Sequence, residues 1–195
     1  PQSYGGVGTA MGPVSGLTQV VCPHGTHADL MRSAYFSGNA LLSERDAVRA
    51  ELGKAHEAIQ VLEDLGIPDT LEHGDLHPDN INVSHDGPIF YDWALVAVTH
   101  PFLSIAYLCH FMKNSRSRPV RIERLADSYL YCWTDCAAQS SLDRALAASQ
   151  SLLPLYWAVT YHTQIMPFLE ERDRWLREQG APFHLRQFLA ALQGD

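Results

Sequence analysis

The stretch LEHGDLHPDNINVSHDGPIFYDW, residues 71–93, decides the fold and the chemistry expected of this chain of 195 residues. It gathers more carboxylate, amide and imidazole side chains than any other part of the sequence: His73, Asp75, His77, Asp79, Asn80 and Asp92. Two short apolar runs, residues 81–83 and 88–91, flank a polar turn at residues 84–87, which is typical of a β-hairpin. Such a hairpin would fold Asp92 back beside Asn80.

This arrangement predicts chemistry at hydroxyl and phosphate groups. Carboxylate and amide oxygens, as in Asp92 and Asn80, suit Mg²⁺, which takes one or two protein oxygens and completes its shell with water and phosphate. Asp75 would then be free to orient or deprotonate a hydroxyl. Turn stabilisation is the alternative explanation of the three residues, because Asp and Asn are favoured wherever backbone amides need acceptors.

The same residues carry a family resemblance. HGDLHPDN at residues 73–80, followed by YDW at 91–93, resembles the signature of the aminoglycoside phosphotransferase and choline kinase family, which shares its core logic with protein kinases. The resemblance is close over residues 45–113 and implies the C-terminal lobe of a protein-kinase-like fold. It implies Asp75 as the catalytic base, Asn80 and Asp92 as Mg²⁺ ligands, His73 and His77 as supporting residues, and ATP or GTP as co-substrate.

Some positions depart from the family pattern. Asp79 stands where glycine is frequent, and Leu95 and Ser104 stand where acidic residues are frequent. The family resembles two-lobed kinases whose first lobe supplies a phosphate-covering loop and a strand-borne lysine. The first lysine here is Lys54, within a predicted helix, and the glycine string GGVGTAMG at residues 5–12 has no clear preceding strand. We therefore expect residues 1–40 to be an irregular Gly/Pro-rich segment and the nucleotide-clamping lobe to be absent.

The rest of the chain, residues 41–195, is expected to form the lobe itself. Apolar spacing predicts helices over residues 43–66, 101–113, 122–139 and 141–166, the last interrupted or kinked at Pro154. Two shorter helices, 169–179 and 182–192, are expected on either side of a stop at Gly180. With a short strand at residues 70–73 and the hairpin, the catalytic loop region spans 70–93. The fold class is therefore mainly α with a small β-hairpin (α+β).

Composition limits the partners. The chain has 14 basic and 22 acidic residues, a formal net charge of −8, which argues against nucleic acid or an anionic membrane and fits a cationic or metal-bridged ligand better. No signal peptide or membrane-spanning run is evident, so a cytoplasmic location is expected. The face left by a missing lobe is expected to be apolar and to favour self-association.

The acceptor substrate is less defined by the sequence than the phosphoryl-transfer site. Weak candidates for contacts to it are Tyr161, His162, Glu170 and Glu171. With Tyr156 and Trp157, Tyr161 and His162 are better explained as a buried core stripe, and a substrate wall is the alternative. The two glutamates are better explained as a solvated helix face. An acidic rim for an aminated substrate is their functional interpretation.

The expected function is a small-molecule kinase lobe that transfers the γ-phosphoryl group of ATP or GTP to a substrate hydroxyl, inactive as these 195 residues alone. Two alternatives remain at this point. The alternating residues His73, Asp75 and His77 could present ligands to zinc in a metal-dependent hydrolase. A kinase-like lobe that only binds, without catalysis, is the other.

Overall fold

The computed structural model describes residues 39–114 and 121–192, so the predicted irregular segment before residue 39 and its glycine string lie outside the described residues. Helices dominate the described part, as predicted: α3 Asn39–Asp64, α4 Phe102–Asn114, α5 Ile122–Tyr131, α6 Gln139–Thr160 and α7 Arg174–Leu192. A small antiparallel strand region accompanies them. The fold class of mainly α with a small hairpin is confirmed. None of the helices in these ranges has the length and apolar character needed to cross a bilayer.

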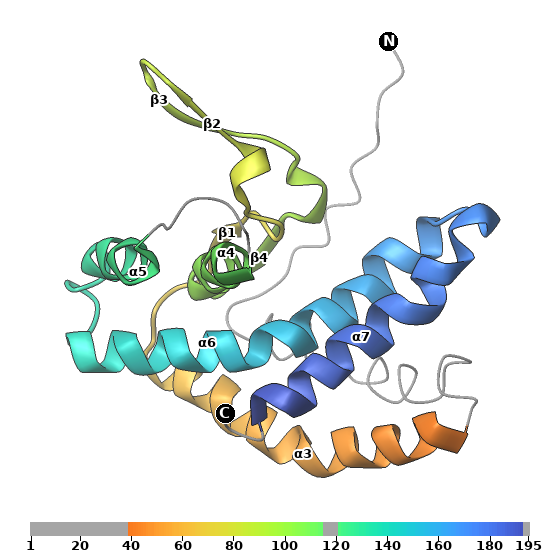
Figure 1. The fold of residues 1–195 in the computed structure, drawn as a ribbon. Coiled ribbons are helices and arrows are strands. Elements are labelled where there is room, and N and C mark those ends of the chain that lie inside the picture. The colour runs from red at the N-terminus through yellow and green to blue at the C-terminus, as the bar shows by residue number, and fades with distance from the viewer. Residues whose placement is uncertain (1–38, 115–120, 193–195) are drawn as a thin grey trace.

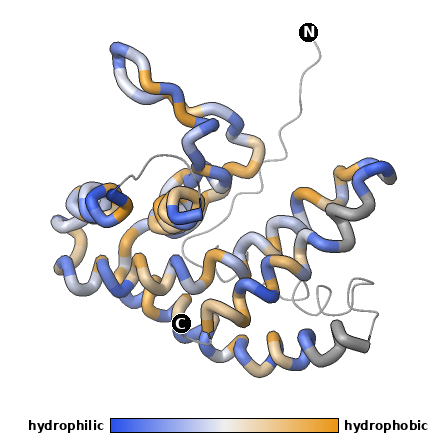
Figure 2. Tube along the Cα trace, viewed as in Figure 1, coloured by the Kyte–Doolittle hydropathy of each residue, from blue (hydrophilic) through white to orange (hydrophobic). Residues whose placement is uncertain are grey.

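Helix α6 is the centre of the helical layer. Figure 1 shows α7 running beside its C-terminal half and α3 passing below both, while α4 and α5 lie on its other side. Apolar positions recur along each helix between polar ones (Figure 2) and form one continuous core. Fully buried members come from every helix and include Val48, Phe102, Leu130, Leu152 and Phe188. Burial of these apolar side chains is the main force that holds the lobe together.

The first helix follows its predicted apolar stripe. Val48, Ala55, Ile59 and Leu62 are buried at spacings that place them on one helix face. The chain leaves the helix at Gly66, whose φ of 64° suits glycine. The predicted start is wrong, because the helix already begins at Asn39 and Ser43 therefore lies inside it.

Two later helix boundaries also differ from the expectation. Helix α5 ends at Tyr131 and not near residue 139, because Thr134 Oγ1 donates to the Tyr131 carbonyl (2.9 Å) and the chain continues as turns. Helix α6 passes through Pro154 without interruption. Pro154 is buried, so its packing compensates for the one backbone hydrogen bond that proline cannot donate. Beyond Thr160 the chain continues as a π turn, Tyr161–Ile165, and a short 3₁₀ turn.

The predicted break at Gly180 is wrong as well. Helix α7 is continuous from Arg174 to Leu192 and contains both Gly180 and Pro182. A Cβ atom on Gly180 would collide with the ring of Tyr161. Glycine stands here because α7 approaches Tyr161 too closely for a side chain, and it does not end the helix.

The strands form two antiparallel pairs among the described residues. The predicted hairpin is present as β2 Ile81–Ser84 and β3 Gly87–Phe90, with Ile81 opposite Phe90. The short strand β1 Thr70–Glu72 pairs with β4 Ala97–Thr99, a strand that the sequence pattern did not indicate. The hairpin projects away from the helices (Figure 1). The predicted catalytic loop thus lies between a strand whose last residue, Glu72, is buried and a hairpin that projects from the helices.

Candidate active site

Strand β1, which precedes the loop, is held in place by hydrogen bonds to its last residue, Glu72. Glu72 is buried, accepts a hydrogen bond from Thr70 Oγ1 (2.8 Å) and accepts another from the backbone N–H of Ser104 (3.2 Å) at the start of α4. Desolvation raises the pKa of Glu72, against the lowering effect of these hydrogen bonds. The loop that follows therefore starts from a fixed point beside α4.

Gly74 lets the loop turn. Its φ is 79°, and a Cβ atom there would collide with the backbone of Leu95. Only glycine combines this left-handed conformation with so close an approach of two backbone segments. The loop is thereby held against the segment that follows Asp92.

His73 links the two sequence motifs. Its Nδ1 accepts a hydrogen bond from the Asp75 backbone N–H (3.3 Å), and its Nε2 donates to the carbonyl of Tyr91 (2.6 Å). These two partners fix the neutral tautomer with the proton on Nε2. The ring also lies against Trp93, with centroids 4.7 Å apart. His73 therefore ties the start of the loop to the residues on both sides of Asp92.

Asn80 closes the loop from its other end. Its side-chain Nδ2 donates to the Asp75 carbonyl (3.0 Å) and to His77 Nε2 (3.1 Å), which leaves the amide oxygen outside these two bonds. The Asn80 carbonyl accepts from the Tyr91 backbone N–H (2.9 Å), extending the hairpin ladder by one pair. This pairing brings Asp92 to the base of the hairpin next to Asn80.

Asp92 has an unusual backbone. It is the one described residue other than glycine with a positive φ (56°, with ψ 66°), and its side chain is exposed. A non-glycine residue in this region costs of order 1 kcal/mol and is typical of functional sites. The strain is compatible with an Asp that is aimed at a ligand.

Helix α4 supports Asp75 and His77 from below. His77 stacks on Phe111 (centroids 5.0 Å apart, planes 19° apart), and His77 Nε2 lies 3.7 Å from Asp75 Oδ2. One turn earlier on α4, burial, the charge of Asp75 and a hydrogen bond to Asp75 raise the pKa of Tyr107. The phenol therefore stays protonated at neutral pH and donates to the Asp75 carboxylate.

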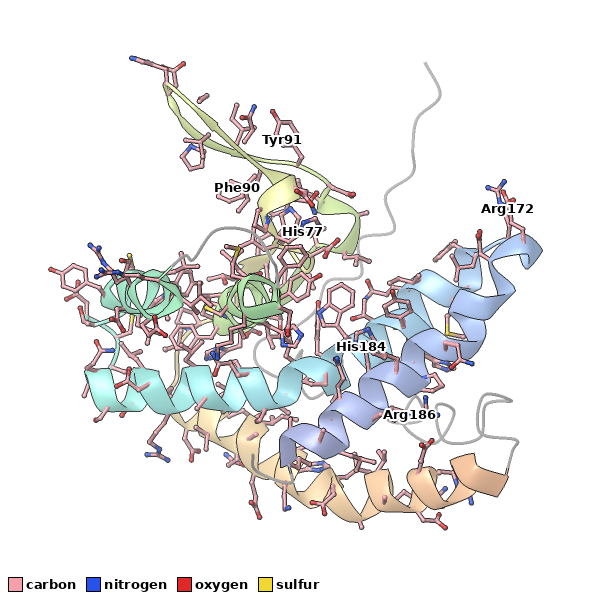
Figure 3. All side chains as sticks on the ribbon, viewed as in Figure 1. His77, Phe90, Tyr91, Arg172, His184 and Arg186 are labelled. Carbon is pink, nitrogen blue, oxygen red and sulfur yellow. The ribbon has the colours of Figure 1, made fainter. Side chains whose placement is uncertain are left out.

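Asp75 opens into a cavity of about 590 Å³. The predicted catalytic loop, α4, α6 with the π turn after it, and α7 contribute to its wall. Figure 3 shows His77 beneath the hairpin and His184 on α7, with Arg186 further along the same helix. A carboxylate at the wall of a concave cavity with several aromatic residues is the arrangement expected of a small-molecule binding site.

The structure brings together most of the predicted site residues. His73, Asp75, His77, Asn80 and Asp92 lie around the loop and the hairpin base, and Tyr161 lines the cavity. His162 and Glu170 are not among the residues that line it. Glu170 pairs with Arg172 (3.1 Å), which Figure 3 places at the far end of the α6–α7 pair, away from His77. The side chain of Glu171 lies outside the described residues.

Several lining residues were missed from the sequence: Tyr107, Gly180, Phe183, His184 and Arg186. A signal did exist for some of them. Tyr107 and Phe111 are an aromatic i,i+4 pair, and Gly180, Phe183 and His184 share the spacing of one helix face. Neither pattern shows which faces turn toward the loop, because that depends on helix packing.

The donor set suits Mg²⁺ better than zinc. Asn80 and Asp92 offer an amide and a carboxylate oxygen, the hard ligands that Mg²⁺ takes together with water and phosphate. Within the described ranges no group of three or more His, Cys, Asp and Glu side chains is placed to hold a metal. Both ring nitrogens of His73 are already engaged, so the His73, Asp75 and His77 set does not present the ligands that a zinc hydrolase needs.

The fold and the loop define a lobe of the kinase-like phosphotransferase class. The model of the phosphotransferase enzyme family, the aminoglycoside phosphotransferase type, matches residues 23–138. The chain therefore belongs to this family, and the resemblance inferred from the sequence is confirmed. No similar protein was found among curated proteins, and no similar structure among solved ones.

Proposed function

We propose that this chain is the catalytic lobe of a small-molecule kinase that transfers the γ-phosphoryl group of ATP or GTP to a substrate hydroxyl. The observation that carries the proposal is the pair of bonds that join the two motifs. Tyr91 donates to Asn80 through its backbone and accepts from His73, which groups Asp75, Asn80 and Asp92 around one loop. Membership of the phosphotransferase family supports the reaction class.

In this proposal Asp75 orients the acceptor hydroxyl and accepts its proton. The acceptor oxygen forms a new bond to the γ-phosphorus while the bond to the β-bridging oxygen breaks, and the nucleoside diphosphate leaves. Asn80 and Asp92 would hold Mg²⁺, which when bound neutralises phosphate charge. Tyr107 positions the Asp75 carboxylate through its hydrogen bond, so catalysis rests mainly on orientation and charge complementarity.

Both described lysines lie on helices and not on a strand of a nucleotide-clamping lobe. Lys54 lies on α3 and pairs with Glu51 (2.8 Å), and Lys113 lies in the last turn of α4. The proposal therefore keeps the expectation that a separate nucleotide-clamping lobe is needed for full activity. The 195 residues alone are expected to bind nucleotide weakly, with a dissociation constant of about 1 mM or above (binding free energy of about −4 kcal/mol or weaker), and to show no useful turnover.

Isothermal titration of the 195-residue chain with ATP and GTP, with and without Mg²⁺, tests this. We expect weak binding that requires Mg²⁺ and that Asp92→Asn weakens further. Asp86→Asn, which removes an exposed carboxylate at the hairpin tip, is the matched control and should leave binding unchanged. If the affinity for nucleotide is the same with and without Mg²⁺ and the same in Asp92→Asn, the assignment of Asp92 as a metal ligand is wrong.

Two other outcomes would change the proposal in defined ways. Micromolar affinity together with turnover would show that residues 1–40 supply a working phosphate clamp, so the expectation of an absent lobe would be wrong. A complete lack of nucleotide binding, even in an enlarged gene product, would favour the non-catalytic binding module.

A further inference from the structure

The cavity beside Asp75 has a predominantly apolar wall. Six of its lining residues are aliphatic or aromatic: Leu95, Tyr107, Trp157, Tyr161, Ile165 and Phe183. Its volume of about 590 Å³ equals the space of roughly 20 water molecules at about 30 Å³ each. A small open-chain alcohol would leave most of this space empty, so the cavity fits an acceptor with a ring system.

The aromatic rings in the wall pack against one another as one connected cluster. The rings of Trp157 and His184 are nearly parallel (26°) with centroids 5.9 Å apart, and Tyr161 lies 5.2 Å from His184. Tyr107 is 4.9 Å from Trp157, with the two ring planes tilted by 44°. Gly180 allows this cluster to form, because any side chain there would collide with Tyr161. Such clusters favour apolar or aromatic rings as ligands.

The charges in the wall do not favour a polycation. Among the described lining residues Asp75 is the single carboxylate, and it already receives the phenol of Tyr107. Arg186 also lines the cavity and makes a forked pair with Glu44 (2.9 and 3.1 Å). Because its guanidinium is positively charged, it does not attract a cationic ligand. Burial lowers the pKa of His184 to about 4, which leaves that ring neutral at pH 7.

We propose that the acceptor is an uncharged, mainly apolar alcohol with a ring system that lies among the aromatic side chains while its hydroxyl reaches Asp75. This inference rests on the proposed function, because it takes the cavity as the acceptor site. An uncharged acceptor differs from the cationic or metal-bridged ligand expected from the net charge of the chain. The charge of −8 belongs to the whole chain, whereas the cavity wall itself is close to neutral.

Three probe molecules differ in whether they carry an apolar ring and whether they carry a positive charge. 2-Naphthylmethanol carries a flat apolar ring and one hydroxyl, 2-naphthylmethylamine has the same ring with a positive charge, and 2-deoxystreptamine is a diaminated cyclitol with hydroxyls. Their affinities are measured by isothermal titration on the 195-residue chain without nucleotide or Mg²⁺. We expect the naphthyl alcohol to bind at least tenfold more tightly than either amine. Tighter binding of either amine overturns the proposal.

A pair of phenylalanine variants locates the binding. Phe183 lines the cavity and is 52% exposed, so Phe183→Ala should fold normally. We expect it to weaken binding of the naphthyl alcohol about 2- to 12-fold, the range for loss of one aromatic contact. Phe168 is 82% exposed and lies outside the lining, and Phe168→Ala is the control. Equal effects of the two variants contradict binding in this cavity.

The binding assay also separates this inference from the proposed function. Selective binding of the naphthyl alcohol with no Mg²⁺-dependent nucleotide binding, either by this chain or by an enlarged gene product, would keep the cavity assignment and remove the kinase function. Nucleotide binding that depends on Asp92, combined with a preference for the amines, would keep the kinase function and overturn the uncharged acceptor.

Discussion

The Nε2 atom of His73 donates a 2.6 Å hydrogen bond to the backbone carbonyl of Tyr91, eighteen residues later in the chain. This bond joins the loop that carries Asp75 to the segment that carries Asp92. Because its other nitrogen accepts a hydrogen bond from the Asp75 backbone N–H, His73 holds the two segments in place relative to each other. The neutral ring with its proton on Nε2 makes both of these hydrogen bonds.

His73→Ala should uncouple the two segments. We expect a loss of about 1–3 kcal/mol in the free energy of unfolding, since the variant leaves the Asp75 N–H and the Tyr91 carbonyl without their partner. In an active preparation the Mg²⁺ concentration for half-maximal activity should rise, because Asp92 is no longer fixed. His85→Ala, at the fully exposed hairpin tip, is the control for urea denaturation and the metal titration. Equal metal dependence in both variants would remove His73 from this positioning role.

Asp75→Asn should preserve the fold and remove most phosphoryl transfer. The amide oxygen can still accept from Tyr107, but it cannot take up the proton of the acceptor hydroxyl. We expect kcat in an active preparation to fall about 10²- to 10⁴-fold, with little change in melting temperature. Asp79→Asn, in the same loop but exposed, should keep kcat within about twofold. A kcat near that of the parent protein in Asp75→Asn would exclude Asp75 as the general base.

The hairpin should mediate self-association. Val83 is 80% exposed, and Phe90, Tyr91 and Trp93 are also exposed, so the hairpin carries an apolar surface outside the core (Figure 3). Sedimentation velocity at increasing protein concentration should show dimers or larger species for the parent chain. Val83→Lys should shift the chain toward monomer, whereas Tyr131→Lys, an exposed position on α5, should not. A parent chain that stays monomeric contradicts this prediction.

Acidification should destabilise the lobe through His100. The side chain is fully buried, and desolvation lowers its pKa from 6.5 to about 4. Its neutral form thus stabilises the folded state above pH 6.5, and this contribution is lost as the pH falls from 6.5 toward 4, because the unfolded chain binds the proton first. Between pH 7.5 and pH 5 this group alone should cost about 2 kcal/mol.

Urea denaturation of the parent and of His100→Asn at both pH values checks the effect. The variant should be less stable at pH 7.5, because the smaller side chain leaves part of the space of the fully buried ring empty, although its amide oxygen can still accept from the Phe102 backbone N–H. Its stability should, however, fall about 2 kcal/mol less on acidification. An identical pH dependence in the two proteins would mean that another group is responsible.

Local patterns in the sequence were sufficient for the elements whose geometry depends on near neighbours. The hairpin of β2 and β3 followed from two apolar runs around a polar turn, and α4 from its apolar run, because turn conformation and helix periodicity are set within a few residues. The grouping of Asp75, Asn80 and Asp92 was predictable for the same reason, since a hairpin returns the chain to its starting point.

Where long-range contacts decide, local patterns failed. Gly180 and Pro182 indicated a break, yet α7 is continuous because packing against α6 and Tyr161 favours the helix over the local preference. Strand β4 forms only because β1 lies beside it. The end of α5 is a different case, because Thr134 bonds the Tyr131 carbonyl only three residues earlier, a local side-chain bond that apolar periodicity does not contain.

The sequence by itself determined the family, the mainly α fold with its hairpin, and the residues gathered in the catalytic loop, since these depend on short-range order and on a contiguous motif. Only the tertiary structure decided what surrounds Asp75. Tyr107, Trp157, Tyr161 and His184 come from three separate segments of the chain, and their meeting in one cavity is fixed by how α4, α6 and α7 pack. The angles and distances between helices depend on the fit of side chains from distant segments, which no local pattern encodes.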